Sequence, residues 1–299
     1  MSESGLLVLD KPPGITSHGV VTRVRRLLGT RRVGHAGTLD PMATGVLVIG
    51  IGRGTRLLGH LTAHDKEYTA TIRLGSSTVT DDREGEPLSH ADPSRLAAVT
   101  DEQIRAEVAR LTGPISQVPT AVSAVKVDGR RAHARVRAGE DVQLAAREVV
   151  VERFDVTAIR RSSGTIDVDV HVACSAGTYV RALARDLGSG LGVGGHLTQL
   201  QRVRSGPWTI ADAVAWDALD AADDPSGYVI DLGRAVHRAF PVITVDAPAR
   251  DWLVNGRPPA QVIHDEVVDV TAVVGPDEDL VALIGPGDRG PAYRAVFQP

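Results

Sequence analysis

The segment that most constrains this chain is a glycine-rich turn followed directly by an apolar run. Three glycines surround a single acid, Asp40, and a proline follows it. Glycine permits backbone angles that other residues resist, and proline fixes the dihedral next to the acid. The apolar residues Val46–Ile51 come next and predict a buried strand. The pattern predicts a carboxylate on a stiff turn, a support suited to presenting one acid to a ligand. An ordinary Asp-Pro turn is the alternative interpretation.

The composition narrows the class of protein. A length of 299 residues favours two domains, and a hydrophobic content of 42% provides a sizeable core. The single cysteine, Cys174, excludes a disulfide framework and a cysteine-built zinc site, which fits a reducing cytoplasm. The residues Met1–Ser4 are not a basic segment followed by an apolar one, so we expect no signal peptide. No uncharged apolar run is long enough to cross a membrane.

The charges are distributed unevenly along the chain. The formal net charge is −4, which argues against a generic nucleic-acid binder. Residues 11–66, however, hold nine Lys or Arg against two Asp, whereas residues 207–299 hold six Arg against fifteen acids. A basic front and an acidic rear are typical of a protein that holds phosphates on one side. The alternative is that these charges are scattered over solvated faces.

The hydrophobic pattern predicts a series of strands and helices. Strands are expected at 5–9, 46–51, 66–74, 147–159, 165–174 and 196–203, and helices at 18–28, 93–111 and 177–189. The acidic and polar residues 75–89 predict a mobile loop. Near the C-terminus, short strands at 242–245, 262–274, 279–284 and 292–297 are broken by Gly and Pro, which suits a small β-barrel. A domain boundary is expected between residues 239 and 240.

A second glycine-rich segment follows the apolar run. Gly50 and Gly52 invite comparison with a dinucleotide-binding loop, but the G-x-G-x-x-G spacing needs a third glycine where the chain has Thr55. We interpret the segment as a strand-to-helix turn. A dinucleotide-binding oxidoreductase is an alternative whose motif is broken.

Five short motifs occur in order along the chain. They are Asp10–Ser17, Gly34–Gly45, Lys66–Tyr68, Cys174–Arg181 and Leu200–Gly206. Together they resemble the TruB family, the bacterial tRNA pseudouridine-55 synthases. The resemblance covers most of residues 5–210. One such motif alone is unspecific, whereas five in this order and at these spacings are specific.

The resemblance implies a fold, an activity and a partner. The fold is α+β, with a pseudouridine synthase domain over residues 1–239 and a small PUA-like RNA-binding β-barrel over residues 240–299. The first domain has a mixed, largely antiparallel sheet, flanking helices and a central cleft. The implied activity converts one T-loop uridine of tRNA, U55, to pseudouridine. The implied partner is the T-arm stem-loop, with no cofactor, metal or membrane, and the protein is expected to act as a monomer. A catalytically silent tRNA-folding chaperone on the same fold is an open alternative, and the two roles can coexist.

The resemblance also assigns the chemistry to particular residues. The reaction breaks the N1–C1′ bond and rejoins the base through C5, and a carboxylate can attack carbon, stabilise a cationic sugar or remove a proton. Asp40 matches this carboxylate, and whether it attacks the sugar, attacks the base or deprotonates the sugar stays open. Tyr68 matches the tyrosine that stacks on the flipped base. Arg181 matches the arginine that pairs with the acid and would keep it ionised.

The remaining predicted site residues bind or support the substrate. His35 matches the histidine that fills the space which the flipped base leaves. Leu200 matches an apolar wall of the pocket, and Lys11 and Pro12 match a loop that supports the site. Gly37, Tyr179, Lys126 and Arg202 complete the predicted substrate-binding residues.

Overall fold

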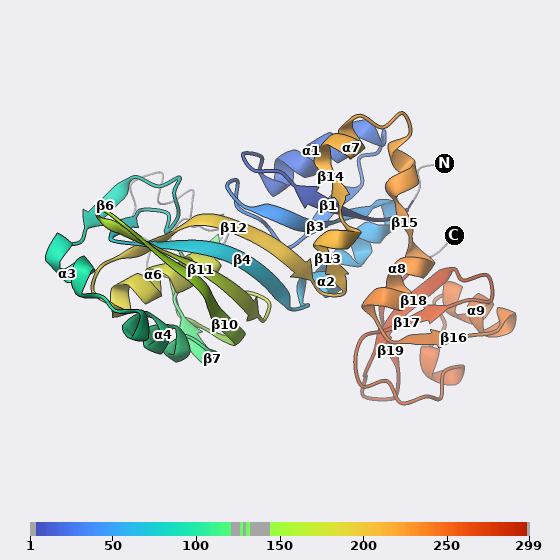
Figure 1. Cartoon of the computed structure of the whole chain (residues 1–299). Coiled ribbons are helices and arrows are strands. Elements are labelled where there is room, and N and C mark those ends of the chain that lie inside the picture. Colours follow the sequence, from blue (N-terminus) through green and yellow to red (C-terminus); the bar gives the residue numbers. More distant parts are fainter. Residues whose placement is uncertain (1–3, 121–125, 128–129, 132–143, 298–299) are drawn as a thin grey trace. The chain divides into compact units, whose positions relative to one another are not determined.

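The chain divides into two compact units. The computed structural model describes residues 4–120, 126–127, 130–131 and 144–297 (Figure 1). The first unit holds residues 1–40, 46–63 and 206–299, and the second holds residues 41–45 and 64–205. Both ends of the chain therefore belong to the first unit, and most of the second unit is inserted between its N-terminal and C-terminal parts.

The first unit begins with three strands and three short helices. They are β1 (Gly5–Lys11), α1 (Ser17–Leu27), β2 (Val33–Ala36), β3 (Thr44–Ile51), η1 (Gly52–Arg56) and α2 (Leu58–Thr62). The elements that return after residue 205 are β13 (Trp208–Thr209), η2 (Ile210–Asp212), β14 (Val214–Ala215), α7 (Trp216–Asp220), η3 (Pro225–Tyr228), β15 (Ile230–Asp231) and α8 (Leu232–Ala239). In this unit β1 lies between β14 and β3, and β2 pairs antiparallel with β3. The turn from β3 into η1 confirms the strand-to-helix interpretation of Gly50–Gly52.

The apolar side chains of β1, β3 and α1 form the core of this unit. The predicted strand at 46–51 is confirmed as β3, whose apolar side chains are buried with those of β1. In α1, the side chains of Val20, Val21 and Val24 lie on the buried stripe that the sequence predicted. Thr16 caps this helix, because its hydroxyl accepts a hydrogen bond from the Gly19 amide at 2.9 Å.

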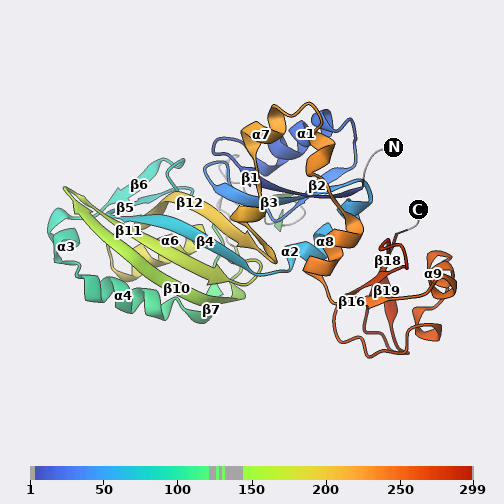
Figure 2. The ribbon, with the colours of Figure 1, turned by 45° about the vertical axis from the view of Figure 1, so that its right-hand side comes forward.

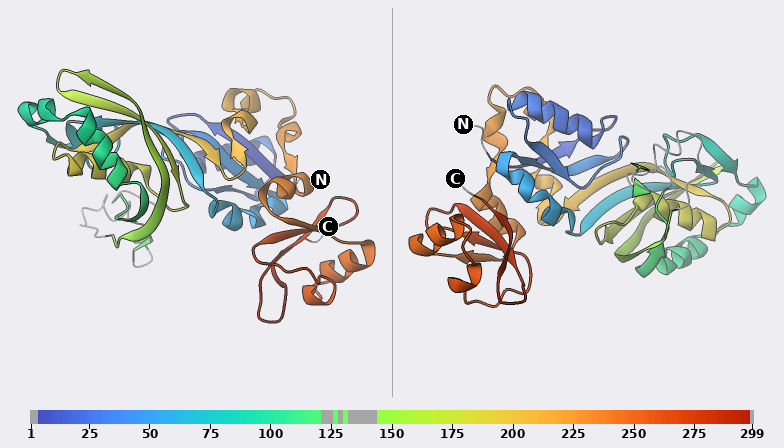
Figure 3. Two further views of the ribbon diagram at one scale, coloured as in Figure 1. Left: turned by 60° about the horizontal axis from the view of Figure 1, so that its bottom comes forward. Right: turned by 180° about the vertical axis from the view of Figure 1, so that it is seen from behind.

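The C-terminal residues form a four-stranded sheet in the order β16-β17-β18-β19. Its elements are β16 (Val242–Thr244), α9 (Ala247–Val254), η4 (Pro259–Gln261), β17 (Thr271–Val274), β18 (Leu280–Gly285) and β19 (Ala292–Val296) (Figures 1 and 3). β16 and β17 are parallel, and the other pairs are antiparallel. Ala272 and Leu283 share a core cluster with Leu6 and Val236 of the same unit. The PUA-like barrel and the boundary at residues 239–240 stay predictions.

The second unit is built on an antiparallel sheet in the order β12-β4-β11-β10-β7 (Figure 2). Its elements are β4 (Lys66–Leu74), β5 (Ser76–Thr78), β6 (Pro87–His90), α3 (Pro93–Ala98), α4 (Asp101–Arg110), β7 (Gly113–Gln117), β8 (Lys126–Val127), β9 (Arg130–Arg131), β10 (Arg147–Ser162), β11 (Thr165–Cys174), α6 (Val180–Gly190) and β12 (Gly195–Ser205). The first two residues of β3, Thr44 and Gly45, pair in parallel with Gln201 and Arg202 of β12. The predicted mixed sheet with flanking helices is therefore confirmed.

The two faces of this sheet have opposite chemistry. On β11 the valines at 168, 170 and 172 are buried, and they alternate with polar residues on the other face. Buried alanines and leucines of α6 supply apolar cover. On the other face, Arg73 forms two hydrogen bonds to Asp167, at 2.7 and 2.8 Å, and Thr71 donates to Asp169 at 2.8 Å. The face opposite the buried valines is therefore polar, and hydrogen-bonded pairs between β4 and β11 link its side chains.

Two predicted elements of this unit are wrong. The helix expected at 93–111 is two helices, α3 and α4, because Thr100 starts a new one with a capping box in which Gln103 bonds the Thr100 amide at 2.9 Å. The mobile loop expected at 75–89 contains the β5–β6 hairpin and two buried acids, Asp81 and Asp82. Among the described residues, no helix combines the length and apolar character needed to span a membrane.

A paired acid in the first unit gives the fold a testable pH dependence. Arg238 of α8 donates to both carboxylate oxygens of Asp212, at 2.9 and 3.0 Å, and the Thr209 amide donates to the same group at 2.8 Å. The hydrogen bonds from Arg238 lower the pKa of Asp212 to about 2, whereas its burial acts in the opposite direction. Because the folded pKa lies below the unfolded one, the stabilisation is present above the unfolded pKa and is lost as the pH falls toward about 2.

Asp212→Asn should lower the free energy of unfolding by about 1 kcal/mol near pH 7, a value reduced for partial exposure of the pair. The difference from wild type should shrink as the pH falls from about 5 to about 3. Urea denaturation at several pH values measures both. Asp265→Asn, at an exposed position, is the control, and an equal loss for the two variants would contradict the pairing.

Candidate active site

Asp40 lies on a turn whose backbone is fixed from the first helix. Ser17, the first residue of α1, is buried, and its hydroxyl donates to the Leu39 carbonyl at 3.0 Å. The Leu39 amide in turn donates to the same hydroxyl at 2.8 Å. Asp40 itself is half-buried. The residue before the acid is therefore held in both hydrogen-bonding directions, as a rigid catalytic support requires.

The end of the turn is fixed by a close approach of two backbones. Gly45 has a φ of 100°, in the region that favours glycine, and it pairs with Arg202 of β12. A Cβ atom at Gly45 would lie 2.2 Å from the Arg202 carbonyl oxygen. Gly37 also has a positive φ, of 88°. Gly37 and Gly45 are therefore glycines for steric reasons: both have a positive φ, and Gly45 also has no room for a Cβ atom.

Lys11 supports the loop that follows β1. Its side chain is fully buried, and its ammonium donates to the carbonyls of Pro12 and Ile15 at 2.8 and 2.7 Å. A buried ammonium needs such acceptors. The ammonium therefore ties two carbonyls of this loop together, and Pro12 lies half-buried within it. The role of Lys11 and Pro12 at the site stays a prediction.

Tyr68, Leu200 and Arg202 lie on one face of the sheet in the second unit. Tyr68 stands opposite Arg202 in the β4–β12 register, and Leu200 stands opposite Ala70. Residues directly opposite share a face, as do residues two apart along a strand. All of these side chains are buried, with Tyr68 8% exposed and Arg202 1% exposed. The structure therefore brings together the predicted aromatic ring, the apolar wall and a cation.

The same neighbourhood is electropositive. Lys66 precedes Tyr68 by two residues and is buried. Its burial and the charge of Arg202 lower the pKa of Lys66 to about 8.

Cys174, which pairs with Lys66 in the β4–β11 register, is also buried, and burial raises the pKa of its thiol to about 11. The thiol is therefore protonated at neutral pH and is unsuited to act as a nucleophile.

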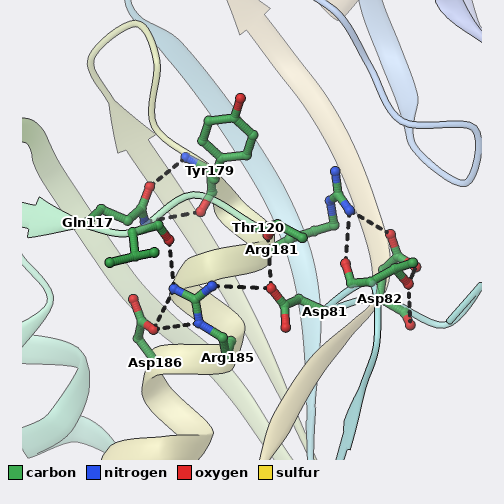
Figure 4. Close-up of polar contacts among 10 residues, drawn as sticks. Asp81, Asp82, Gln117, Thr120, Tyr179, Arg181, Arg185 and Asp186 are labelled. Atoms are coloured by element: carbon green, nitrogen blue, oxygen red, sulfur yellow. Dashed lines mark hydrogen bonds and ion pairs between the residues drawn. The ribbon is translucent and has the colours of Figure 1, made fainter. Parts of the chain in front are cut away.

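Arg181 lies in the first turn of α6 and is held by the segment that follows β5. Its side chain is 6% exposed, its Nη1 donates to the Thr80 carbonyl at 2.8 Å, and it lies 3.4 Å from the carboxylate of Asp82 (Figure 4). Asp82 is fixed in turn, because the hydroxyl of Thr80 and the amide of Glu84 donate to it at 2.5 and 3.0 Å. The guanidinium orientation therefore depends on a buried acid.

Tyr179 precedes α6 and is fixed through its backbone. Gln117, at the end of β7, accepts from the Tyr179 amide at 2.8 Å and donates to the Tyr179 carbonyl at 3.1 Å. The ring is directed away from Gln117 in Figure 4. These two hydrogen bonds between the Gln117 side chain and the Tyr179 backbone fix the start of the helix that carries Arg181.

The predicted site residues are divided between the two units. Lys11, Pro12, His35, Gly37 and Asp40 belong to the first. The residues of the second are Tyr68, Tyr179, Arg181, Leu200 and Arg202. The backbone of Lys126 also lies in the second unit, in β8, which pairs with β9. The pairing of Asp40 with Arg181 stays a prediction.

Comparison with known proteins identifies the family of this chain. Residues 25–180 match the TruB family pseudouridylate synthase (N terminal domain), and residues 181–226 match the tRNA pseudouridylate synthase B C-terminal domain. The tRNA pseudouridine synthase B of Cutibacterium acnes is 54% identical over 287 residues, which is 96% of this chain and 95% of the relative. That of an Arthrobacter species is 64% identical over 218 residues, which is 72% of this chain and 70% of the relative. The chain belongs to the TruB family.

A solved structure has a similar fold. A Cbf5-Nop10-Gar1 complex contains a chain with a TM-score of 0.70 and 25% identity, and the match covers 99% of this chain and 84% of that one. The resemblance of the five motifs to the TruB family is confirmed by the family models and by the relatives that match most of the chain. As a member of this family the chain is a pseudouridylate synthase, an isomerase.

Sequence reasoning missed two residues of this TruB site. Asp82 lies in an acidic run that has the composition of a solvated loop, and nothing in the run distinguishes a buried acid from an exposed one. Gln117 is buried at the end of β7, and its polar side chain gave no signal there. Within residues 4–120, 126–127, 130–131 and 144–297, no group of three or more His, Cys, Asp or Glu is arranged to hold a metal ion.

Gly45→Ala should destabilise this TruB protein by more than about 2 kcal/mol, because the new methyl group adds a backbone clash to the strain of a positive φ. Gly164→Ala is the matched control. Gly164 also has a positive φ, of 79°, but a Cβ atom there would have no neighbour within 4 Å. The control should lose only about 1 kcal/mol. Chemical denaturation measures both, and equal losses would show that the close approach to Arg202 has no energetic weight.

Proposed function

We propose that this protein converts the T-loop uridine of tRNA, U55, to pseudouridine, with Asp40 as the catalytic carboxylate. One observation carries the proposal: the acid that the family motif assigns to catalysis follows a residue whose amide and carbonyl are both bound by the buried hydroxyl of Ser17. Relatives that match 96–99% of this chain are named tRNA pseudouridine synthase B, which supports tRNA as the substrate. The T-arm is the proposed binding element, the monomer the proposed form and the cytoplasm the proposed compartment.

The chemistry needs one acid and no added reagent. The N1–C1′ bond of the uridine breaks, the uracil turns, and a C5–C1′ bond forms. The proton on C5 is replaced by the bond to the sugar, and N1 gains a proton, so atoms and charges balance. Asp40 takes part at the sugar or the base, or removes a proton from the sugar. Because the uracil is retained and no water is added, a second catalytic carboxylate is unnecessary.

The residues of the second unit supply binding and electrostatics. The target base is stacked inside a folded loop and must be flipped out, and stacking on an aromatic ring returns about 1–3 kcal/mol. Tyr68 supplies that ring, and Leu200 supplies an apolar wall on the same sheet face. Arg181, oriented by Asp82, is the cation that keeps Asp40 ionised.

Asp40→Asn should reduce pseudouridine formation in unmodified tRNA by at least about 10²-fold, because the amide can neither attack carbon nor accept a proton. Mapping pseudouridine in the product, with Asp223→Asn as an exposed control, measures the effect. Equal product from Asp40→Asn and wild type would refute the proposed role. Tight tRNA binding with no product from either would instead select the folding chaperone.

Binding to tRNA should weaken at least about tenfold between about 50 and 200 mM salt, since phosphate contacts release counterions. Arg23 is paired with Asp220, so the exposed arginines Arg31 and Arg32 are better candidates for phosphate contacts. Arg32→Gln should lower the slope of log affinity against log salt by about one. Arg234→Gln, on the acidic C-terminal side, should leave the slope unchanged. A tRNA affinity that does not change with salt would contradict phosphate binding by the basic N-terminal segment, residues 11–66.

A further inference from the structure

A second arginine–aspartate pair lies next to Arg181 and Asp82. Arg185 follows Arg181 by one turn of α6, so both side chains project from the same side of the helix. The Nη1 atom of Arg185 lies 3.4 Å from the carboxylate of Asp81 (Figure 4). Its Nη2 donates to the Val118 carbonyl at 2.7 Å. Two successive acids are therefore bound by two arginines one helical turn apart.

The backbone of Asp81 has an uncommon conformation. Its φ is 56°, and among the described residues only Asp81 and Glu278 are non-glycine residues with a positive φ. Such a conformation persists where its surroundings determine it. Here the Asp81 amide donates to the Thr78 carbonyl at 3.2 Å, and the Asp81 carbonyl accepts from the Leu197 amide at 3.0 Å. The hydroxyl of Thr120 donates to the Asp81 carboxylate at 2.9 Å.

This conformation directs neighbouring groups to different partners. The side chain of Asp81 meets Arg185 and Thr120, whereas the Thr80 carbonyl and the Asp82 carboxylate both meet Arg181. If the Asp81 carboxylate lost its contacts with Arg185 and Thr120, the turn could relax. The Thr80 carbonyl and the Asp82 carboxylate, which both contact the Arg181 guanidinium, would then move together. Burial raises the pKa of Asp81, and the charge of Arg185 and the hydrogen bond from Thr120 oppose that shift.

We propose that Asp81 and Arg185 are positioning residues for Arg181. They fix the turn at residues 80–82, and that turn orients the guanidinium that faces the reaction. Neither residue touches the substrate in this role. The catalytic part of the proposal rests on the proposed pseudouridine synthase function, and its geometric part does not. Loss of the pair should slow the chemical step and leave tRNA affinity unchanged, because misorientation of a catalytic group acts on the transition state.

Asp81→Asn is the most selective test. Asparagine tolerates a positive φ and keeps an acceptor for Thr120, so only the charge is removed. Single-turnover conversion should slow about tenfold in Asp81→Asn and in Arg185→Gln, with tRNA affinity within about twofold of wild type. Arg185→Gln also removes the hydrogen bond to Val118 and the 2.9 Å ion pair with Asp186. The double variant should therefore be no slower than Arg185→Gln alone, because the charge of Asp81 acts through Arg185. Asp92→Asn, at the cap of α3 where asparagine caps equally well, is the matched control.

A second measurement tests the positioning without any activity. The side-chain nitrogen signals of Arg181, identified by their loss in Arg181→Lys, should show slow guanidinium rotation in the wild type and faster rotation in Asp81→Asn. Thr120→Val, which removes the hydroxyl that donates to Asp81, should show an intermediate rate of guanidinium rotation. It replaces Asp81→Asn in this test if Asp81→Asn does not fold. A wild type that makes no pseudouridine would defeat the proposed function, while the Arg181 signals would still report on the turn. Unchanged rotation in the folded variants, or wild-type conversion rates in both single variants, would overturn the positioning role.

Discussion

The contact between the backbones of Gly45 and Arg202 is the constraint on which the candidate site depends most. A Cβ atom at this point would lie 2.2 Å from a carbonyl oxygen, so no residue but glycine fits without a backbone shift. The contact pairs the end of the Asp40 turn with β12, the strand that carries Leu200 and Arg202. Within the first unit, Ser17 binds the same turn at Leu39. A turn held at Leu39 and at Gly45 has few accessible backbone conformations. Under the proposed function, this restriction lowers the entropy that catalysis must overcome.

The side chains of β12 reach their positions through two irregularities in its pairing with β4. The register shifts between Leu197 and Gln199 and again between Arg202 and Arg204. Each shift inserts one residue and reverses which side chains face the core. Between the shifts, Leu200 and Arg202 share the face of Tyr68, whereas a regular strand that buried Leu197 would have turned them to the other face. Bulges beside a site are a common means of aiming side chains at it.

Local patterns in the sequence predicted most of the regular structure. The strand at 66–74 and the strand at 165–174 have the predicted bounds, because alternating burial leaves a direct trace in hydrophobicity. The helix at 93–111 was wrong because a cap at Thr100 competes with an unbroken apolar period. The turn at Asp40 was predictable because glycines and a proline mark it, whereas the catalytic role of Asp40 stays a prediction. Asp82 was not predictable, because its burial depends on partners about a hundred residues away, and composition holds no record of them.

The buried Arg181–Asp82 pair is better explained by orientation than by stability. Taking a guanidinium and a carboxylate out of water costs several kcal/mol for each ion, so their attraction in the interior yields little net stabilisation. An apolar pair of similar volume would serve a core equally well or better. What an apolar pair cannot supply is a fixed positive charge with defined donor directions, and Arg181 needs both if it is to keep a neighbouring carboxylate ionised. The acidic residues after β5 therefore have a physical reason to be buried, although their composition is that of a solvated loop.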